Sequence, residues 1–204
     1  MKRRHCTPIA VVLLIAISTL SLAIGNSAEN SYLVSDHEWS EQSKVWLARA
    51  MVSEAGWKNT SDHIAIAYVL LRRWKLAQKR YAKFPLVSVI RKYCAGFRGV
   101  EFTARQKWIK NLTADAARPV HWPNDIYWSD YRERWLAVLD TAEQWRQGQY
   151  ADPCAGKAMY WGGPLDHPSK RMIKMDCGET KNFYYTVRPL LSAEERTSEA
   201  LRLD

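Results

Sequence analysis

The sequence contains neither a CxxC nor an HExxH pattern, and its five histidines are scattered along the chain. Zinc sites bring cysteine and histidine together at short, fixed spacings, so a metal site has little support and we expect none. Internal repeats and low-complexity linkers are also missing, which favours a single domain. Nothing in the sequence requires a cofactor, and we expect none.

Only one long apolar run occurs, PIAVVLLIAISTLSLAI, from Pro8 to Ile24. Basic residues precede it at positions 2–4 and small residues follow it around Gly25, with Ala28 as a second cleavage position, as in a secretory signal. The alternative is a retained membrane anchor, because the run is just long enough to span a bilayer when tilted. We expect a signal peptide over residues 1–25 and export to the periplasm or the extracellular cell wall. Membrane contact would then come only through an uncleaved signal segment.

About 179 of the 204 residues remain after residue 25, enough for one domain with a sizeable core. The signal segment holds three basic residues and no acidic one, so its removal lowers the formal charge from +9 to +6. A basic exported protein is expected to associate with anionic polymers or surfaces. Cell-wall polymer, anionic lipid head groups and nucleic acid all fit that description, so charge alone does not choose among them.

Of the four cysteines, Cys6 lies in the signal segment. Two of the other three are expected to pair in an oxidising compartment. We expect a disulfide between Cys154 and Cys177, which would close a loop rich in glycine and proline and contribute roughly 3 kcal/mol. The two pairings that use Cys94 stay open at this stage.

Hydrophobic periodicity predicts a mainly α fold with a small β ribbon (α+β) over residues 26–191, followed by a charged tail over 192–204. The ribbon is expected from AMYW and NFYYTV, two short stretches rich in strand-favouring residues near the C-terminus. One helix, which starts near residue 63, is apolar on nearly every side in its first half and should be central in the core. The loop RPVHWPNDIYW carries aromatics that look exposed. Helices are expected at about 38–55, 63–81, 84–97, 103–112 and 130–147.

The carboxyl group of Glu54 stands where this periodicity calls for an apolar side chain. On a helical wheel Glu54 lies within about 60° of Leu47, Ala50 and Met51. The negative end of the helix dipole and desolvation would both favour its protonated form. Such an acid can protonate a glycosidic oxygen. The alternative is a glutamate that rotates into solvent or pairs with Lys58, Arg72 or Arg73.

Four blocks of the sequence, taken in order, resemble the spore-cortex-lytic enzyme, or cell wall hydrolase, family. They cover about residues 47–97 and 135–185 and follow one another in the order of the family. The blocks are LARAMVSEAGWKNTSDHIAIAYVLLRR, FPLVSVIRKYCAGF, WLAVLDTAEQWRQGQYADPCAGKAMYW and CGETKNFYY.

The resemblance implies a lysozyme-like helical fold, peptidoglycan glycan strands as the substrate, and Glu54 as the general acid/base. It implies a lytic transglycosylase, in which the muramic 6-hydroxyl attacks the anomeric carbon and no water is consumed. It also matches Tyr160, Asn182 and Tyr184 to cleft positions that bind the sugar. A further partner could be a cell-envelope assembly.

The chain departs from the family pattern at three places. Arg72 replaces the usual asparagine, residues 98–128 look like an insertion, and the closing block has Thr180 or Lys181 in place of a histidine. The insertion carries Trp122, Tyr127 and Trp128, which would extend a sugar groove or cover an edge of the core. We include Trp128 among the expected substrate-binding residues.

Three alternatives to the transglycosylase remain at this stage. One is a non-catalytic peptidoglycan-binding protein that retains the fold, and another is a muramidase that releases ordinary reducing ends. A third is a basic exported protein that acts on nucleic acid or a membrane surface. This third reading fits export less well than an anionic wall polymer, so no nucleic-acid partner is expected.

Overall fold

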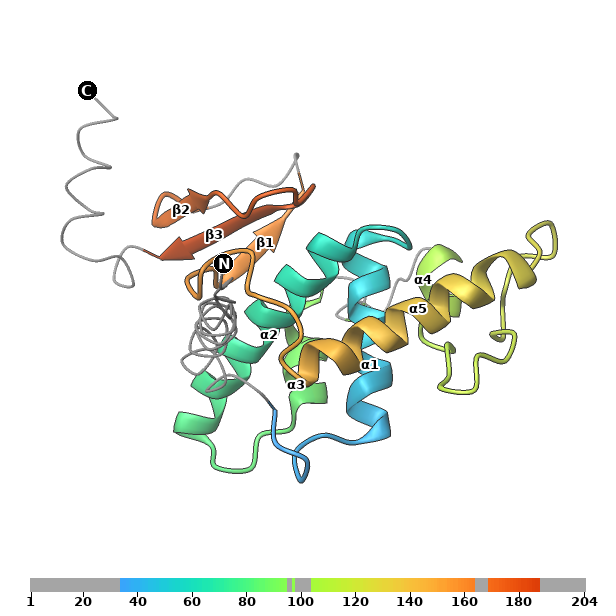
Figure 1. The fold of residues 1–204 in the computed structure, drawn as a ribbon, viewed down its shortest axis with the longest axis horizontal. Coiled ribbons are helices and arrows are strands. Elements are labelled where there is room, and N and C mark those ends of the chain that lie inside the picture. Colours follow the sequence, from blue (N-terminus) through green and yellow to red (C-terminus); the bar gives the residue numbers. More distant parts are fainter. Residues whose placement is uncertain (1–33, 95–96, 98–103, 164–168, 188–204) are drawn as a thin grey trace, which may run out of the picture. The chain divides into compact units, whose positions relative to one another are not determined.

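Helices come first along the chain and strands last (Figure 1). The computed structural model describes residues 34–94, 97, 104–163 and 169–187, all within one unit over Val34–Asp204. The predicted signal peptide and charged tail lie outside the described residues. The prediction of a mainly α fold with a small β part is confirmed. The elements are α1 (Glu41–Ala55), α2 (Thr60–Arg80), α3 (Leu86–Tyr93), α4 (Ala104–Ile109), α5 (Ser129–Arg146), β1 (Tyr160–Gly162), β2 (Met172–Met175) and β3 (Phe183–Val187).

The turn between α1 and α2 is short and has well-defined caps. Gly56 ends α1 with a φ of 77°, a backbone conformation that glycine adopts at little cost, and its N–H donates to the carbonyl of Val52. Asn59 caps α2 by accepting a hydrogen bond from the backbone N–H of Asp62. The last turn of α1, which contains Glu54, is therefore held close to the first turn of α2.

The core is built around α1 and α2, and α1 packs against α2, α3 and α5. Nearly every residue of α2 from Asp62 to Trp74 is buried, which confirms the central position predicted for this helix. Burying a large apolar side chain in this way stabilises the fold by about 1.5–3 kcal/mol. The largest fully buried apolar side chains of the helices include Leu47, Met51, Ile66, Leu70, Leu71, Ile90, Ile109 and Trp135.

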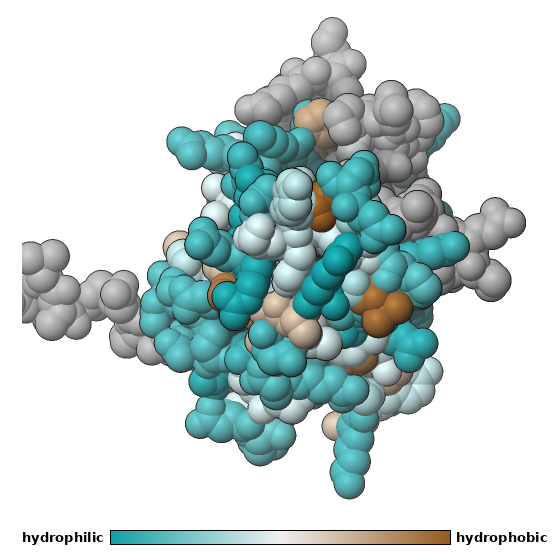
Figure 2. All heavy atoms as spheres, turned by 90° about the vertical axis from the view of Figure 1, so that its right-hand side faces the viewer, coloured by the Kyte–Doolittle hydropathy of each residue, from teal (hydrophilic) through white to brown (hydrophobic). Residues whose placement is uncertain are grey.

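The segment between α4 and α5 is a loop, as predicted for RPVHWPNDIYW, and side-chain donors hold its backbone carbonyls. Because a buried carbonyl without a partner is costly, these donors let an irregular segment cover the helices. Figure 2 shows the molecule from the right-hand side of Figure 1. This face is mostly hydrophilic, with separate hydrophobic residues. The bonds are Arg49 Nη2 to Leu112 O at 2.6 Å, Trp135 Nε1 to Thr113 O at 2.7 Å, Trp128 Nε1 to Ala116 O at 3.0 Å and Trp122 Nε1 to Ile126 O at 2.7 Å.

The strands form one antiparallel sheet in the order β1-β3-β2. The predicted pairing of the two aromatic stretches is confirmed, with Trp161 opposite Tyr184. The third strand, β2, was missed, because MIKM carries a single β-branched residue and a lysine and so gives little strand signal. Side chains at paired positions share a face of the sheet, so Trp161, Tyr184 and Met175 point the same way.

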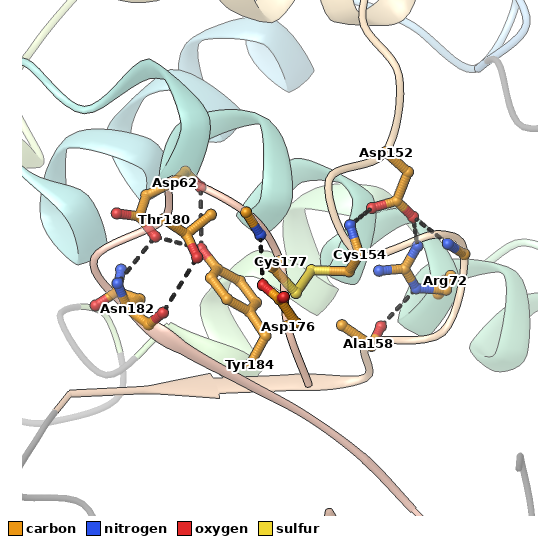
Figure 3. Close-up of a disulfide and its surroundings, with 12 residues drawn as sticks. Asp62, Arg72, Asp152, Cys154, Ala158, Asp176, Cys177, Thr180, Asn182 and Tyr184 are labelled. Carbon is orange, nitrogen blue, oxygen red and sulfur yellow. Dashed lines mark hydrogen bonds and ion pairs between the residues drawn. A yellow bond between two sulfur atoms is a disulfide. The ribbon is translucent and has the colours of Figure 1, made fainter. Parts of the chain in front are cut away.

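The predicted disulfide between Cys154 and Cys177 is present. It joins the segment before β1 to the loop between β2 and β3, over a sequence separation of 23 (Figure 3). Cys94 is a fully buried residue of the core. The disulfide therefore joins the chain segment that leads into β1, an outer strand, to the loop that leads into β3, the central strand.

Candidate active site around Glu54

Glu54 lies where the end of α1 meets the sheet. Its side chain is half-buried, and its Oε2 accepts a hydrogen bond of 3.1 Å from the indole Nε1 of Trp161 in β1. Its backbone carbonyl accepts a second one, of 3.2 Å, from the side-chain amide of Asn182. Two residues more than 100 positions further along the chain thus hold one glutamate in the last turn of a helix.

Asn182 is itself held by Asp62, a fully buried carboxylate in the first turn of α2 (Figure 3). The Asp62 oxygens accept hydrogen bonds from the backbone N–H groups of Lys181 at 2.8 Å and Asn182 at 3.1 Å. They also accept from the side-chain amide of Asn59 and from the Tyr184 hydroxyl, the latter at 2.8 Å. With four donors and no exposure, this carboxylate is a structural anchor that attaches the end of the β2–β3 connection to α2.

Tyr184 is fully buried, and its hydroxyl donates to the Asp62 carboxylate. Burial raises the pKa of Tyr184, and the neighbouring negative charge of Asp62 raises it further. The hydroxyl therefore stays protonated and keeps donating. The family resemblance predicts that Tyr184 binds the sugar. In the structure its side chain is buried in the core and supports the sheet.

His63 secures the turn that follows Glu54. Its Nε2 lies 2.7 Å from the carbonyl oxygen of Gly56, and its side chain is buried. Burial lowers the pKa of His63, against the smaller opposing effects of the Gly56 carbonyl and the Asp62 charge. A neutral ring with the proton on Nε2 donates to that carbonyl and fixes the direction in which α1 ends.

Tyr160 and Trp161 are neighbours in β1 with different partners. The indole of Trp161 reaches Glu54, whereas the Tyr160 ring lies against the guanidinium of Arg73, 3.7 Å from its carbon. Successive side chains of a strand point to opposite faces, so only one of the two can face Glu54. The resemblance matched Tyr160 to a sugar-binding position, which stays a prediction, and no sequence pattern marks Trp161 as the residue that contacts Glu54.

Trp128 belongs to an aromatic cluster over the start of α5. Its ring lies edge-on to that of Trp122 at 4.8 Å, and its indole donates to the carbonyl of Ala116. Trp57, only three residues after Glu54, joins the cluster by stacking on Trp108 at 5.5 Å. Trp57 and Trp128 are half-buried and Trp122 is buried, so the exposed parts of Trp57 and Trp128 are the surfaces that this cluster offers near the end of α1.

Arg72, which replaces an asparagine of the family that the sequence resembles, holds the turn before β1 in place. Its side chain is nearly buried, forms an ion pair with Asp152 and donates from Nε to the carbonyl of Ala158 at 2.5 Å (Figure 3). Asp152 also accepts from the backbone N–H groups of Cys154 and Gly156, each at 2.9 Å. Arg72 thus fixes the turn that leads into β1, and so the approach of Trp161 to Glu54.

A cavity of about 420 Å³ lies beside Asn182. Its walls come from the end of β2, the loop that follows it, and the start of β3. They offer the polar side chains of Lys174, Asp176, Thr180 and Asn182 together with the ring of Phe183, over which the Lys174 ammonium lies at 3.6 Å. Hydrogen-bonding groups beside an aromatic face are suited to a sugar ring or a peptide.

Within the described ranges, no three His, Cys, Asp or Glu side chains gather as ligands for a metal ion. Among the helices in the described part of the chain, none has the length and apolar character needed to cross a membrane. Around Glu54 the structure places a carboxyl group with an indole donor to orient it and aromatic faces nearby.

No protein-family model, no curated protein and no solved structure matches this chain.

Proposed function

We propose that this protein is an exported enzyme that cleaves the glycan strand of peptidoglycan, with Glu54 as its only catalytic acid/base. The observation that carries the proposal is the environment of Glu54, a half-buried carboxyl group at the end of α1 oriented by the indole of Trp161. The ordered resemblance to the cell wall hydrolase family and the expected signal peptide support the same reading. The basic charge of the chain also suits an anionic wall polymer.

The proposed reaction needs one carboxyl group. Glu54 gives its proton to the bridging oxygen as the bond from that oxygen to the anomeric carbon breaks. The 6-hydroxyl of the same muramic residue then attacks the anomeric carbon and returns its proton to Glu54. One glycosidic bond is lost, one intramolecular 1,6-anhydro bond forms, and the enzyme ends in its starting protonation state.

The environment of Asp62, the carboxylate that holds Asn182, favours a transglycosylase over a glycosidase that uses two carboxylates. Ordinary retaining and inverting enzymes need a second carboxylate that reaches the anomeric carbon or an attacking water. Asp62 is fully buried and already accepts four hydrogen bonds, so it is not available to a substrate. A mechanism in which the substrate supplies its own nucleophile fits this network, because it needs the carboxyl group of Glu54 and no contribution from Asp62.

The test is digestion of purified sacculi, with mass spectrometry of the soluble products. The wild type should release muropeptides with 1,6-anhydro ends. Glu54→Gln should fold with an unchanged thermal midpoint and lower the rate by at least about a hundredfold, because general acid catalysis contributes that much or more. Glu133→Gln, an exposed glutamate on α5, is the matched control and should cleave like the wild type.

Each other outcome identifies a different function. Ordinary reducing ends would keep Glu54 as the acid but make the protein a muramidase. Retention on sacculi without soluble product, equal in the wild type and Glu54→Gln, would indicate a non-catalytic binding protein. Undiminished release by Glu54→Gln would remove Glu54 from the mechanism.

A further inference from the structure

A second cavity, of about 360 Å³, lies between the C-terminal half of α2 and α3. These helices pack against each other (Figure 1). Of the described residues that line the cavity, three are cationic and none is acidic. Two others are among the most exposed large apolar side chains of the described residues, Leu76 at 51% and Tyr81 at 58%. The cavity therefore combines positive charge with uncovered apolar surface, a pairing that favours an anionic ligand with an apolar body.

Arg73 is the buried cation of this cavity, at 8% exposure. The rings of Tyr93 and Tyr160 lie 3.9 and 3.7 Å from its guanidinium carbon, and its Nε donates to the carbonyl of Met159 at 2.5 Å. Its Nη2 is buried and has no hydrogen-bond partner among the described residues. A buried N–H group without an acceptor is costly, so this edge of the guanidinium is suited to an incoming acceptor.

The geometry of a guanidinium selects the kind of acceptor. Its planar N–H edge matches the two oxygens of a carboxylate, and such charge-assisted bonds are about twice as strong as neutral ones. Arg80 and Lys92, both exposed, stand at the same cavity and add two positive charges that attract the same group. Leu76 and Tyr81 would cover the apolar part of the ligand.

We infer that this cavity binds a free carboxylate of the peptidoglycan stem peptide. The inference rests on the proposed function, since it places a second part of the same polymer on the same domain. Arg73 contacts Tyr160, and the next residue along β1, Trp161, holds Glu54, so Arg73 and Glu54 contact neighbouring residues on opposite faces of one strand. A four-residue stem peptide extends to about 13 Å, long enough to leave the glycan strand and reach a neighbouring surface.

The experiment measures binding without cleavage. Calorimetry would titrate a synthetic tetrapeptide, L-Ala–γ-D-Glu–meso-diaminopimelate–D-Ala, into the Glu54→Gln protein. The same peptide with amidated carboxyl groups is the ligand control. Arg80→Gln/Lys92→Gln removes two charges from the cavity, and Lys79→Gln/Arg91→Gln removes two exposed charges from the same helices outside it. Arg73→Lys keeps the buried charge and removes the planar edge.

Kd should rise about tenfold or more for Arg80→Gln/Lys92→Gln, the cavity pair, and for the amidated peptide, because a charge-assisted interaction is lost in each case. The control pair should change Kd by less than about twofold, because Lys79 and Arg91 do not line the cavity and so do not contact the bound carboxylate. Arg73→Lys should weaken binding although the net charge is unchanged.

Equal effects of the two pairs would overturn the inference, because they would indicate general attraction to positive charge. An amidated peptide that binds like the free acid would overturn it as well. So would the absence of peptide binding, at millimolar concentration, to the Glu54→Gln protein with an otherwise unchanged cavity. A sacculus assay on the protein with an intact Glu54 separates the two proposals. Cleavage without peptide binding refutes only this inference, and peptide binding without cleavage refutes only the proposed function.

Discussion

Removal of the Asp62 carboxylate tests how the sheet is attached to the helices. Asp62 accepts from two backbone N–H groups at 2.8 and 3.1 Å, from the Tyr184 hydroxyl at 2.8 Å and from the side chain of Asn59. Asp62→Ala leaves all four donors without this acceptor. Of these, the Tyr184 hydroxyl has the least access to water, since its side chain is fully buried.

The expected loss follows from these contacts. A hydrogen bond to a charged group contributes about 1.5–3 kcal/mol, but the four do not add, because Lys181 is exposed and its N–H can turn to water. A buried donor left without its acceptor costs about 1–3 kcal/mol, so with more than one such donor we expect Asp62→Ala to cost about 3–5 kcal/mol. Tyr184→Phe, which removes one of these donors, should cost about 1.5–3 kcal/mol.

Urea unfolding of the wild type, both single variants and the double variant would give the coupling energy between Asp62 and Tyr184. A hydrogen-bonded buried pair should show a coupling of about 1–2 kcal/mol. Asp140→Ala, an exposed aspartate on α5, is the matched control and should stay within about 0.5 kcal/mol of the wild type. A loss below about 1 kcal/mol for Asp62→Ala, or the absence of coupling, would refute the assignment of Asp62 as the anchor of β3.

Three further predictions concern the same region. Because burial lowers the pKa of His63, the free energy of unfolding should fall as the pH drops from 6.5 through that lowered pKa. His63→Gln should flatten this part of a plot of urea midpoint against pH, and an unchanged slope would assign it to other groups. Cys154→Ser/Cys177→Ser should lower the free energy of unfolding by about 3 kcal/mol, and dithiothreitol should do the same to the wild type but not to the variant. Trp161→Phe keeps the apolar ring but removes the donor to Glu54, so sacculus cleavage should slow about tenfold at an unchanged thermal midpoint; full activity would show that Trp161 does not orient the acid.

The helices were predictable because their signals are local. The periodicity lies within each helix, and Gly56 and Asn59 stand directly beside the helices that they end and begin. The structure places α2 within three residues of its predicted start. The disulfide was predictable for a related reason, since the spacing of Cys154 and Cys177 brackets a stretch punctuated by glycine and proline.

The partners of Glu54 were harder to predict because they depend on contacts distant in sequence. Asn59 and Asp62 form a local helix cap, but the hydrogen bonds that Asp62 accepts from Lys181 and Asn182 span 119 and 120 residues and leave no local signal. In β1 the two candidate residues are both aromatic, so the strand has no polar and apolar alternation to show which side faces the helices. A one-residue change of register exchanges the two faces, and the sequence alone does not select between them.

These contacts explain why the C-terminal quarter of the chain belongs to the candidate site. Trp161 reaches Glu54 from β1, and Asn182 reaches its carbonyl from the segment before β3. The disulfide joins the chain just before the first of these segments to the loop just before the second, and Asp62 attaches the second to α2. Because a carboxyl group must be held in a definite direction to transfer a proton, the sheet is part of what would make Glu54 an acid catalyst. Helix α1 supplies the residue, but α1 alone does not set the direction of its side chain.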